Sequence, residues 1–238
     1  GLGDVYKRQE NVCAFAERHG IRKIVFTSSI APYGAAEELK EETTLPMPNT
    51  PYGISKLVAE KIHQTWQAGG EGRQLTIVRP GVVFGRGENG NFTRLYWGIR
   101  GHKFMYPGRK DTIKACIYVK ELVRFMLYRL EHHDSGVELY NCCYEPAYTI
   151  EHIVESMKRV TNMKVKVPFM PGWLIMTAAG IAGALGSPMG ICPARVRKLQ
   201  ISTNICGKKL SASGYRFRYT FEEALADWYK DNGNLYLR

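Results

Sequence analysis

The sequence predicts an α/β fold with a doubly wound parallel sheet, because helical and strand-like segments alternate near its start. Apolar residues recur at helical spacing over residues 12–19 and are followed by a short apolar run at residues 24–26. The pattern then repeats, with a helical segment over Pro51–Ala68 and a second apolar run at residues 75–78. Short apolar runs are typical of parallel strands that helices cover on both faces.

The second part of the sequence predicts a smaller α+β lobe. Helical spacing recurs over residues 121–130 and 149–160, and a short strand-like segment lies between them at residues 138–141. Thr220 and Glu223 form the pattern of a capping box, which predicts the start of a last helix.

The composition is that of a soluble folded protein. The chain has 238 residues, of which 45% are hydrophobic and 23% are charged, and this excludes a disordered chain. Lysine and arginine number 33 against 22 acidic residues, and the formal net charge of +11 favours an anionic partner. The basic residues are scattered, without a dense run interleaved with aromatic residues, so nucleic acid is not the expected partner.

The cysteines and the apolar segments indicate the cellular compartment and whether a metal site or a membrane span is expected. The six cysteines show neither a CxxC motif nor the paired spacing of a zinc site, so no metal is expected. No apolar secretory segment stands at the start, which predicts reduced thiols in a cytoplasmic protein. The longest apolar stretch, residues 173–186, is shorter than the roughly 20 residues of a membrane span, so we expect buried or interface helices there.

Tyr52 and Lys56 are four residues apart and open the predicted helix over Pro51–Ala68. Thr50 is the expected N-cap, and proline is common at the first helical position. The spacing places both side chains on one helix face, where the lysine ammonium stabilises the tyrosine phenolate. The pair therefore predicts a tyrosine that acts as a base.

A second tyrosine and lysine at the same spacing, Tyr106 and Lys110, have Pro107 and Gly108 between them. Proline excludes a helix interior, so the spacing does not place these two side chains on one face. Tyr52 and Lys56 are therefore the predicted catalytic pair.

Two serines follow the first predicted strand. Ser28 and Ser29 come directly after residues 24–27, at the carboxyl end where open α/β sheets bind their ligands. A hydroxyl at this place can orient a substrate hydroxyl group. A polar turn that leaves the strand is the alternative interpretation of the same residues.

Four segments share one order along the chain. They are Val25-Phe26-Thr27-Ser28-Ser29 with Tyr33-Gly34, Pro51-Tyr52-Gly53-Ile54-Ser55-Lys56 with Glu60, Arg79-Pro80-Gly81-Val82-Val83-Phe84-Gly85, and Ile117-Tyr118-Val119. In order, spacing and context they resemble the extended short-chain dehydrogenase/reductase superfamily, specifically its NAD-dependent epimerase/dehydratase branch. The resemblance covers about residues 11–232 and implies a Rossmann-like sheet with a smaller substrate-binding lobe.

The resemblance also implies a role for each matching residue. Tyr52 is the general base, Lys56 stabilises its phenolate and binds the nicotinamide ribose, and Ser29 donates a hydrogen bond to the reacting oxygen. The residues expected to line the nicotinamide side of the cofactor are Thr27, Ser28, Pro80 and Val83. NAD is the expected cofactor, and NADP stays open because the sequence shows no glycine-rich turn with its acidic residue.

The residues expected to bind the substrate differ in part from those of the family that the chain resembles. In relatives that bind nucleotide-diphosphate sugars, an asparagine and an arginine contact the diphosphate or the base, and Asn91 and Lys114 stand at these places. Lysine keeps the positive charge but lacks the two-pronged hydrogen bonding of arginine. Arg197 adds a positive charge later in the chain. The expected partner is a small molecule, namely a nucleotide sugar.

The reaction implied first is epimerisation of a nucleotide-diphosphate sugar, by oxidation at C4 to a ketone and reduction from the opposite face. Dehydratase relatives carry Asp-Glu after the catalytic serine, where this chain has Ile30-Ala31, so dehydration is not expected. One alternative is an NAD(P)-dependent dehydrogenase or ketoreductase of a keto-sugar or a 3β-hydroxysteroid-like substrate. The other is a non-catalytic nucleotide-binding regulatory module on the same fold.

The expected division of the chain follows from the same resemblance. Residues 10–90 are expected to form the C-terminal part of the NAD-binding domain, and residues 91–238 mainly the substrate-binding lobe, with some segments returning. Residues 4–9 resemble the translated end of a sequencing adapter, so residues 1–9 are interpreted as a non-native scar. The chain is then expected to be an N-terminally truncated enzyme that binds cofactor weakly or not at all, and homodimerisation through the helix at Tyr52 is expected.

Overall fold

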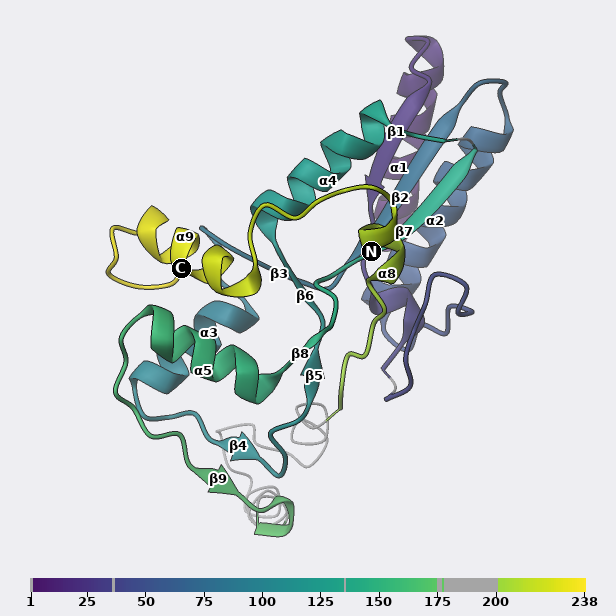
Figure 1. Cartoon of the computed structure of the whole chain (residues 1–238). Helices are drawn as coiled ribbons and strands as arrows, with labels where there is room; N and C mark the ends of the chain where they lie inside the picture. The colour runs from purple at the N-terminus through teal and green to yellow at the C-terminus, as the bar shows by residue number, and fades with distance from the viewer. Residues whose placement is uncertain (1, 36, 135, 175–176, 178–200) are drawn as a thin grey trace. The chain divides into compact units, whose positions relative to one another are not determined.

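The computed structural model divides the chain into two compact units (Figure 1). It describes residues 2–35, 37–134, 136–174, 177 and 201–238. Unit 1 comprises residues up to 83 together with 115–147 and 205–218, and unit 2 comprises residues 84–114, 148–204 and 219–238. The chain therefore passes into unit 2 after Val83 and returns to unit 1 twice.

Unit 1 is built on a parallel sheet of three strands in the order β1-β2-β7. The strands are β1 (Lys23–Thr27), β2 (Gln74–Pro80) and β7 (Val137–Cys142). Phe26 lies opposite Ile77, and Ile77 lies opposite Leu139, so the apolar runs are in register across the sheet. The parallel α/β fold predicted from the sequence is confirmed.

Helices cover both faces of this sheet, as alternation along the strands requires. On one face Ile24, Phe26 and Ile77 pack with Ala59 of α2 (Pro51–Ala68), and α1 (Leu2–Arg18) packs against α2. On the other face Val25, Val78 and Tyr140 pack with Phe125 of α4 (Val119–Glu131). The short helix α8 (Lys208–Ala212) contacts β7.

The local signals for the ends of the first two helices are confirmed. The Thr50 side chain accepts a hydrogen bond from the Gly53 amide at 3.0 Å, and Pro51 occupies the first turn of α2. Gly20, after the end of α1, has a φ of +64°, which favours glycine. Residues 2–9 belong to α1, and their interpretation as a scar stays a prediction.

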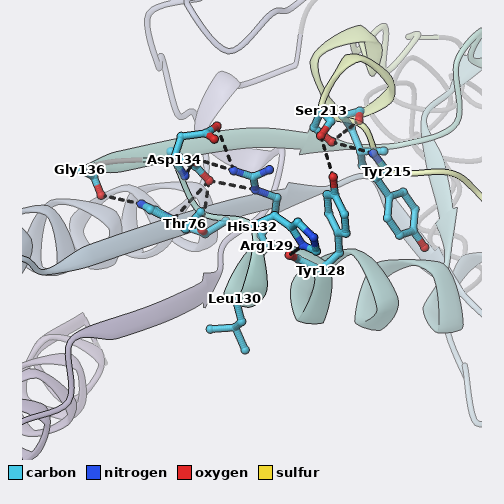
Figure 2. Close-up of polar contacts among 12 residues, drawn as sticks. Thr76, Tyr128, Arg129, Leu130, His132, Asp134, Gly136, Ser213 and Tyr215 are labelled. Carbon is cyan, nitrogen blue, oxygen red and sulfur yellow. Dashed lines mark hydrogen bonds and ion pairs between the residues drawn. The ribbon is translucent and has the colours of Figure 1, made fainter.

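A cluster of polar side chains joins the end of α4 to the amino ends of β2 and β7 (Figure 2). Arg129 donates to Glu138 Oε1 from Nη2 at 2.6 Å and to Oε2 from Nε at 3.1 Å. Thr76 Oγ1 lies 3.0 Å from His133 Nδ1, and the hydroxyl of Tyr128 donates to the Ser213 carbonyl. The contacts of Arg129 with Glu138 and of Thr76 with His133 hold the sheet at the end opposite to its carboxyl edge, whereas the bond from Tyr128 to Ser213 joins α4 to the residue after α8.

Unit 2 contains helices and short strand pairs. Its described elements include α3 (Asn91–Arg100), α5 (Ile150–Val160) and α9 (Phe221–Asp231), the parallel pair β4 (Tyr106–Pro107) and β9 (Phe169–Met170), and the antiparallel pair β5 (Ile113–Lys114) and β8 (Tyr148–Thr149). The pair of β3 (Val82–Phe84) and β6 (Cys116–Tyr118) belongs to unit 1, except for Phe84, where the chain enters unit 2. The predicted capping box of Thr220 and Glu223 is confirmed at the start of α9.

Over the described ranges, no helix is long and apolar enough to cross a membrane, and no three His, Cys, Asp or Glu residues are grouped to hold a metal. Most of the apolar stretch 173–186 and Cys192 lie outside the described residues. The other five cysteines are buried and free. Burial raises the pKa values of Cys116, Cys142 and Cys143 and keeps these thiols protonated.

The buried His63 ring is expected to make the stability of the chain depend on pH. Its ring is 1% exposed, stacks on Phe26 at 4.3 Å and places Nδ1 2.9 Å from the Ala59 carbonyl. Burial lowers the pKa of His63, against the opposing effect of the Ala59 carbonyl. The unfolded chain therefore binds a proton at higher pH than the folded chain, so protonation favours unfolding.

We expect the free energy of unfolding to fall as the pH drops below the ordinary histidine pKa of 6.5. Urea denaturation at a series of pH values tests this, with His63→Phe as the comparison because phenylalanine keeps the ring but does not titrate. The decline should be less steep in the variant. Equal slopes for both proteins would show that His63 has no part in it.

Candidate active site

Tyr52 and Lys56 lie on successive turns of α2, and Tyr52 is 55% exposed. The Lys56 Nζ donates a hydrogen bond to the Thr27 carbonyl at 3.0 Å and lies 6.0 Å from the centroid of the Tyr52 ring. Because Thr27 is the last residue of β1, this bond fixes the ammonium at the carboxyl end of the strand. The structure thus brings Lys56 to the carboxyl end of β1, the edge at which Ser28 and Ser29 follow the strand.

Ser29 lies beside the first turn of α2. Its Oγ accepts a hydrogen bond from the Ala31 amide at 3.1 Å, which holds the turn that begins η1 (Ala31–Tyr33). Gly53 of α2 approaches this turn so closely that a Cβ there would lie 2.6 Å from the Ala31 carbonyl oxygen. A glycine at position 53 therefore lets the loop that carries Ser29 pack directly against the turn that carries Tyr52.

A buried carboxylate stands one turn beyond Lys56. Glu60 is 2% exposed and accepts hydrogen bonds from Arg79 Nε at 2.8 Å and Nη2 at 2.6 Å. Its Oε1 also accepts from Ser28 Oγ at 2.5 Å. Two parallel hydrogen bonds between arginine and carboxylate are geometrically specific. These three residues, which we call the Glu60 network, join α2 to the carboxyl ends of β1 and β2.

The charge of the Glu60 network is balanced. Burial alone lowers the pKa of Arg79, but the hydrogen bonds and the charge of Glu60 outweigh it, and the pKa rises above its ordinary value. Tyr33 lies under the guanidinium, with 4.6 Å from its ring centroid to Arg79 Cζ, and donates to Asn141 Oδ1 at 2.8 Å. Burial raises the pKa of Tyr33, against the effect of Arg79, so this hydroxyl keeps its proton.

The residues predicted to line the cofactor surround the same edge. Thr27 is exposed at the end of β1, whereas Pro80 is buried at the end of β2 and its carbonyl accepts the Ile30 amide at 3.2 Å. Val83 is half-buried in β3. The Ser28 hydroxyl is directed into the protein, toward Glu60. The cofactor contacts of these four residues stay predictions.

The residues predicted for the substrate lie elsewhere in the chain. Asn91 is exposed at the start of α3, and Lys114 belongs to β5, so both are part of unit 2. Lys114 Nζ donates to the Ile201 carbonyl at 2.8 Å. Arg197 lies outside the described residues. The role of all three in binding substrate stays a prediction.

Fold and site together define a class: a doubly wound α/β sheet whose carboxyl edge carries Ser29, Tyr52 and Lys56 is that of an extended short-chain dehydrogenase/reductase. A family model described as the NAD dependent epimerase/dehydratase family matches residues 5–143, and the chain belongs to this family.

Curated relatives include sugar 4-epimerases. The chain is 33% identical over 221 residues to the N-acetyl-alpha-D-glucosaminyl-diphospho-ditrans,octacis-undecaprenol 4-epimerase of Escherichia coli O157:H7, covering 90% of this chain and 66% of that protein. It is 25% identical over 167 residues to a UDP-glucose 4-epimerase of Yersinia enterocolitica, covering 61% of this chain and 50% of that protein. The chain spans about half to two thirds of the length of these relatives.

Solved structures share the fold. A UDP-N-acetylglucosamine 4-epimerase from Bacillus cereus aligns with a TM-score of 0.70 at 17% identity, covering 93% of this chain and 69% of that one. MoeE5 in complex with UDP-glucose and NAD aligns with a TM-score of 0.69 at 20% identity, covering 94% of this chain and 70% of that one.

The contacts among the three residues of the Glu60 network are not predicted by the sequence analysis. In the sequence, Glu60 closes one motif and Arg79 opens another. A signal was present, because Glu60 continues the four-residue steps from Tyr52 and Lys56, and Arg79 interrupts an otherwise apolar strand. Two opposite charges on buried elements predict an ion pair, but the partner of each is fixed by the packing of α2 on β2.

Proposed function

We propose that the whole protein is an NAD-dependent 4-epimerase of a sugar carried on a diphosphate. The observation that supports this most is the placement of Ser29, Tyr52 and Lys56 at one edge of the sheet, with Lys56 tied to the end of β1. The relatives named as 4-epimerases support the choice of reaction.

The side chains at this edge fit the nicotinamide ribose of NAD. Lys56 offers an ammonium that donates hydrogen bonds of the kind that ribose hydroxyls accept, and the Tyr52 phenolate oxygen on the adjacent helical turn accepts a hydrogen bond from a hydroxyl. Thr27 stands beside them at the exposed end of β1. Bound NAD⁺ supplies the acceptor for the hydrogen and the two electrons of the sugar C4–H bond, and it returns them.

Three side chains carry the proton chemistry. The Tyr52 phenolate takes the proton of the C4 hydroxyl, and the Lys56 ammonium stabilises the phenolate before this transfer. Ser29 donates its hydroxyl hydrogen to the same substrate oxygen, since its own oxygen already accepts from Ala31. In the reverse direction Tyr52 returns the proton to the oxygen, and the opposite configuration results when the other face of the ketone is reduced.

The carrier of the sugar has two candidates. A nucleoside diphosphate is the carrier that the sequence motifs predict, and UDP-glucose 4-epimerases are among the relatives. A polyprenyl diphosphate is favoured by the relative of 33% identity, which covers 90% of the chain. It is also favoured by Lys114, which replaces the arginine of nucleotide-sugar enzymes and donates to a backbone carbonyl.

The assay that tests the proposal gives the whole protein catalytic NAD and N-acetylglucosamine on either UDP or polyprenyl diphosphate. We expect the 4-epimer to form on one of the two carriers without net accumulation of reduced cofactor. Reduced cofactor that accumulates in equal amount with a keto product would identify a dehydrogenase instead. No product from either carrier would contradict the proposal.

A further inference from the structure

Unit 2 exposes a cluster of large apolar side chains around β4 and β9. Trp173 is 68% exposed, Phe169 50%, Leu174 41% and Met105 37%. We call these four residues the β4–β9 patch. Isolated apolar residues are normal on a surface, but a group of them that includes tryptophan and phenylalanine marks a contact surface.

The pairing of the two strands holds the patch together. Tyr106 lies opposite Phe169, and the Tyr106 amide donates to the Pro168 carbonyl at 2.9 Å. Tyr106 is 2% exposed in β4, whereas Met105, which directly precedes this strand, is exposed. The Leu174 amide donates to the Pro171 carbonyl at 3.1 Å, in a turn that keeps Trp173 and Leu174 close to β9.

The chain around the patch is basic. Residues 101–109 and 156–174 contain no acidic residue. Lys103, Lys164 and Lys166 are exposed, and among the described residues none of the three forms an ion pair. Exposed lysines in the same chain segments as exposed tryptophan and phenylalanine form the pattern of a surface that meets anionic headgroups and the acyl boundary together.

We propose that the β4–β9 patch docks the protein on an anionic lipid bilayer. A second copy of the chain is a poorer occupant, because symmetric pairing of two patches brings their lysines together. The biological role of this docking rests on the proposed function, because a sugar on a polyprenyl diphosphate is presented at the bilayer surface, where a docked enzyme meets it. Its support comes from the exposed side chains and their charges alone.

Vesicle co-sedimentation in the absence of substrate tests this proposal, with equimolar phosphatidylglycerol and phosphatidylcholine compared with phosphatidylcholine alone. We expect the whole protein to bind the anionic vesicles, and binding to weaken as salt is raised. Phe169→Ser combined with Trp173→Ser should weaken binding at least fivefold. Lys164→Glu with Lys166→Glu should weaken it by about thirtyfold or more, from about 1 kcal/mol for each of the two basic residues at the surface.

The matched control is Leu45→Ser with Met47→Ser, which removes side chains that are 82% and 76% exposed on unit 1. This variant should bind vesicles like the parent protein. Absence of vesicle binding, or equal loss in the control, overturns the proposal, as does self-association without lipid that the Phe169 and Trp173 changes abolish. The lysine variant keeps the test decisive if the apolar variant misfolds. Since no substrate is present, the result stands apart from the epimerase assay.

Discussion

Replacing Tyr52 by phenylalanine should lower the kcat of the whole protein by about a thousandfold, the range of a positioned acid–base group. The change removes the hydroxyl that takes and returns the substrate proton but keeps the aromatic ring. Tyr52 is 55% exposed at the start of α2, so the substitution leaves no cavity in the core. Steady-state kinetics measure the loss, and circular dichroism checks that the fold is kept.

Tyr106→Phe is the matched control, because Tyr106 also has a lysine four residues on, with Lys110 Nζ 5.1 Å from its ring centroid. Tyr106 is 2% exposed in β4, and burial raises its pKa, which is the opposite of what a base requires. This variant should keep kcat within about a few fold of the parent. Activity that survives Tyr52→Phe, or falls equally in Tyr106→Phe, would show that the catalytic base lies elsewhere.

Replacing Glu60 by alanine should lower the free energy of unfolding by about 3–5 kcal/mol. The change leaves the Arg79 guanidinium, which is 3% exposed, without its counter-charge and without the acceptor of two hydrogen bonds. The Ser28 hydroxyl loses its acceptor as well. Urea denaturation at neutral pH measures the effect. A second variant that also carries Arg79→Met should recover part of the loss, because the uncompensated charge is then removed.

Glu151→Ala provides the control for the Glu60 substitution. Glu151 pairs with Lys110 at 2.9 Å, but both side chains are nearly half exposed. Exposed pairs of this kind contribute about 0–1 kcal/mol, so the variant should be almost as stable as the parent. If Glu60→Ala were no more destabilising than Glu151→Ala, the Glu60 network would not be what holds α2 on the sheet.

Local sequence signals were sufficient for the elements of unit 1. The bounds of α2 follow from Thr50 and Pro51 at its start and from the glycines after Ala68, and each of these signals acts within a few residues. The strands β1 and β2 could be predicted because their apolar runs are continuous, as burial on both faces requires. The pair of Tyr52 and Lys56 could be predicted to share a helix face for the same reason, since the two residues are one turn apart.

Contacts between distant residues could not be predicted in the same way. Glu60 and Arg79 belong to different elements, and only the packing of α2 on β2 determines that they meet. The hydrogen bond from the Ser28 hydroxyl to Glu60 inside the protein is another contact of this kind. The two-residue strands β4 and β9 are too short to give a periodic pattern, and their pairing is set by residues more than sixty positions apart.

The claim that C4 is oxidised and then reduced again is tested most directly with a substrate that carries deuterium at the sugar C4. We expect the whole protein, with catalytic NAD, to convert it into a 4-epimer that retains the deuterium at C4 in ordinary water. The hydrogen leaves C4 and returns to the same carbon, while Tyr52 exchanges only the hydroxyl proton. Loss of deuterium from C4 to the solvent would contradict this account.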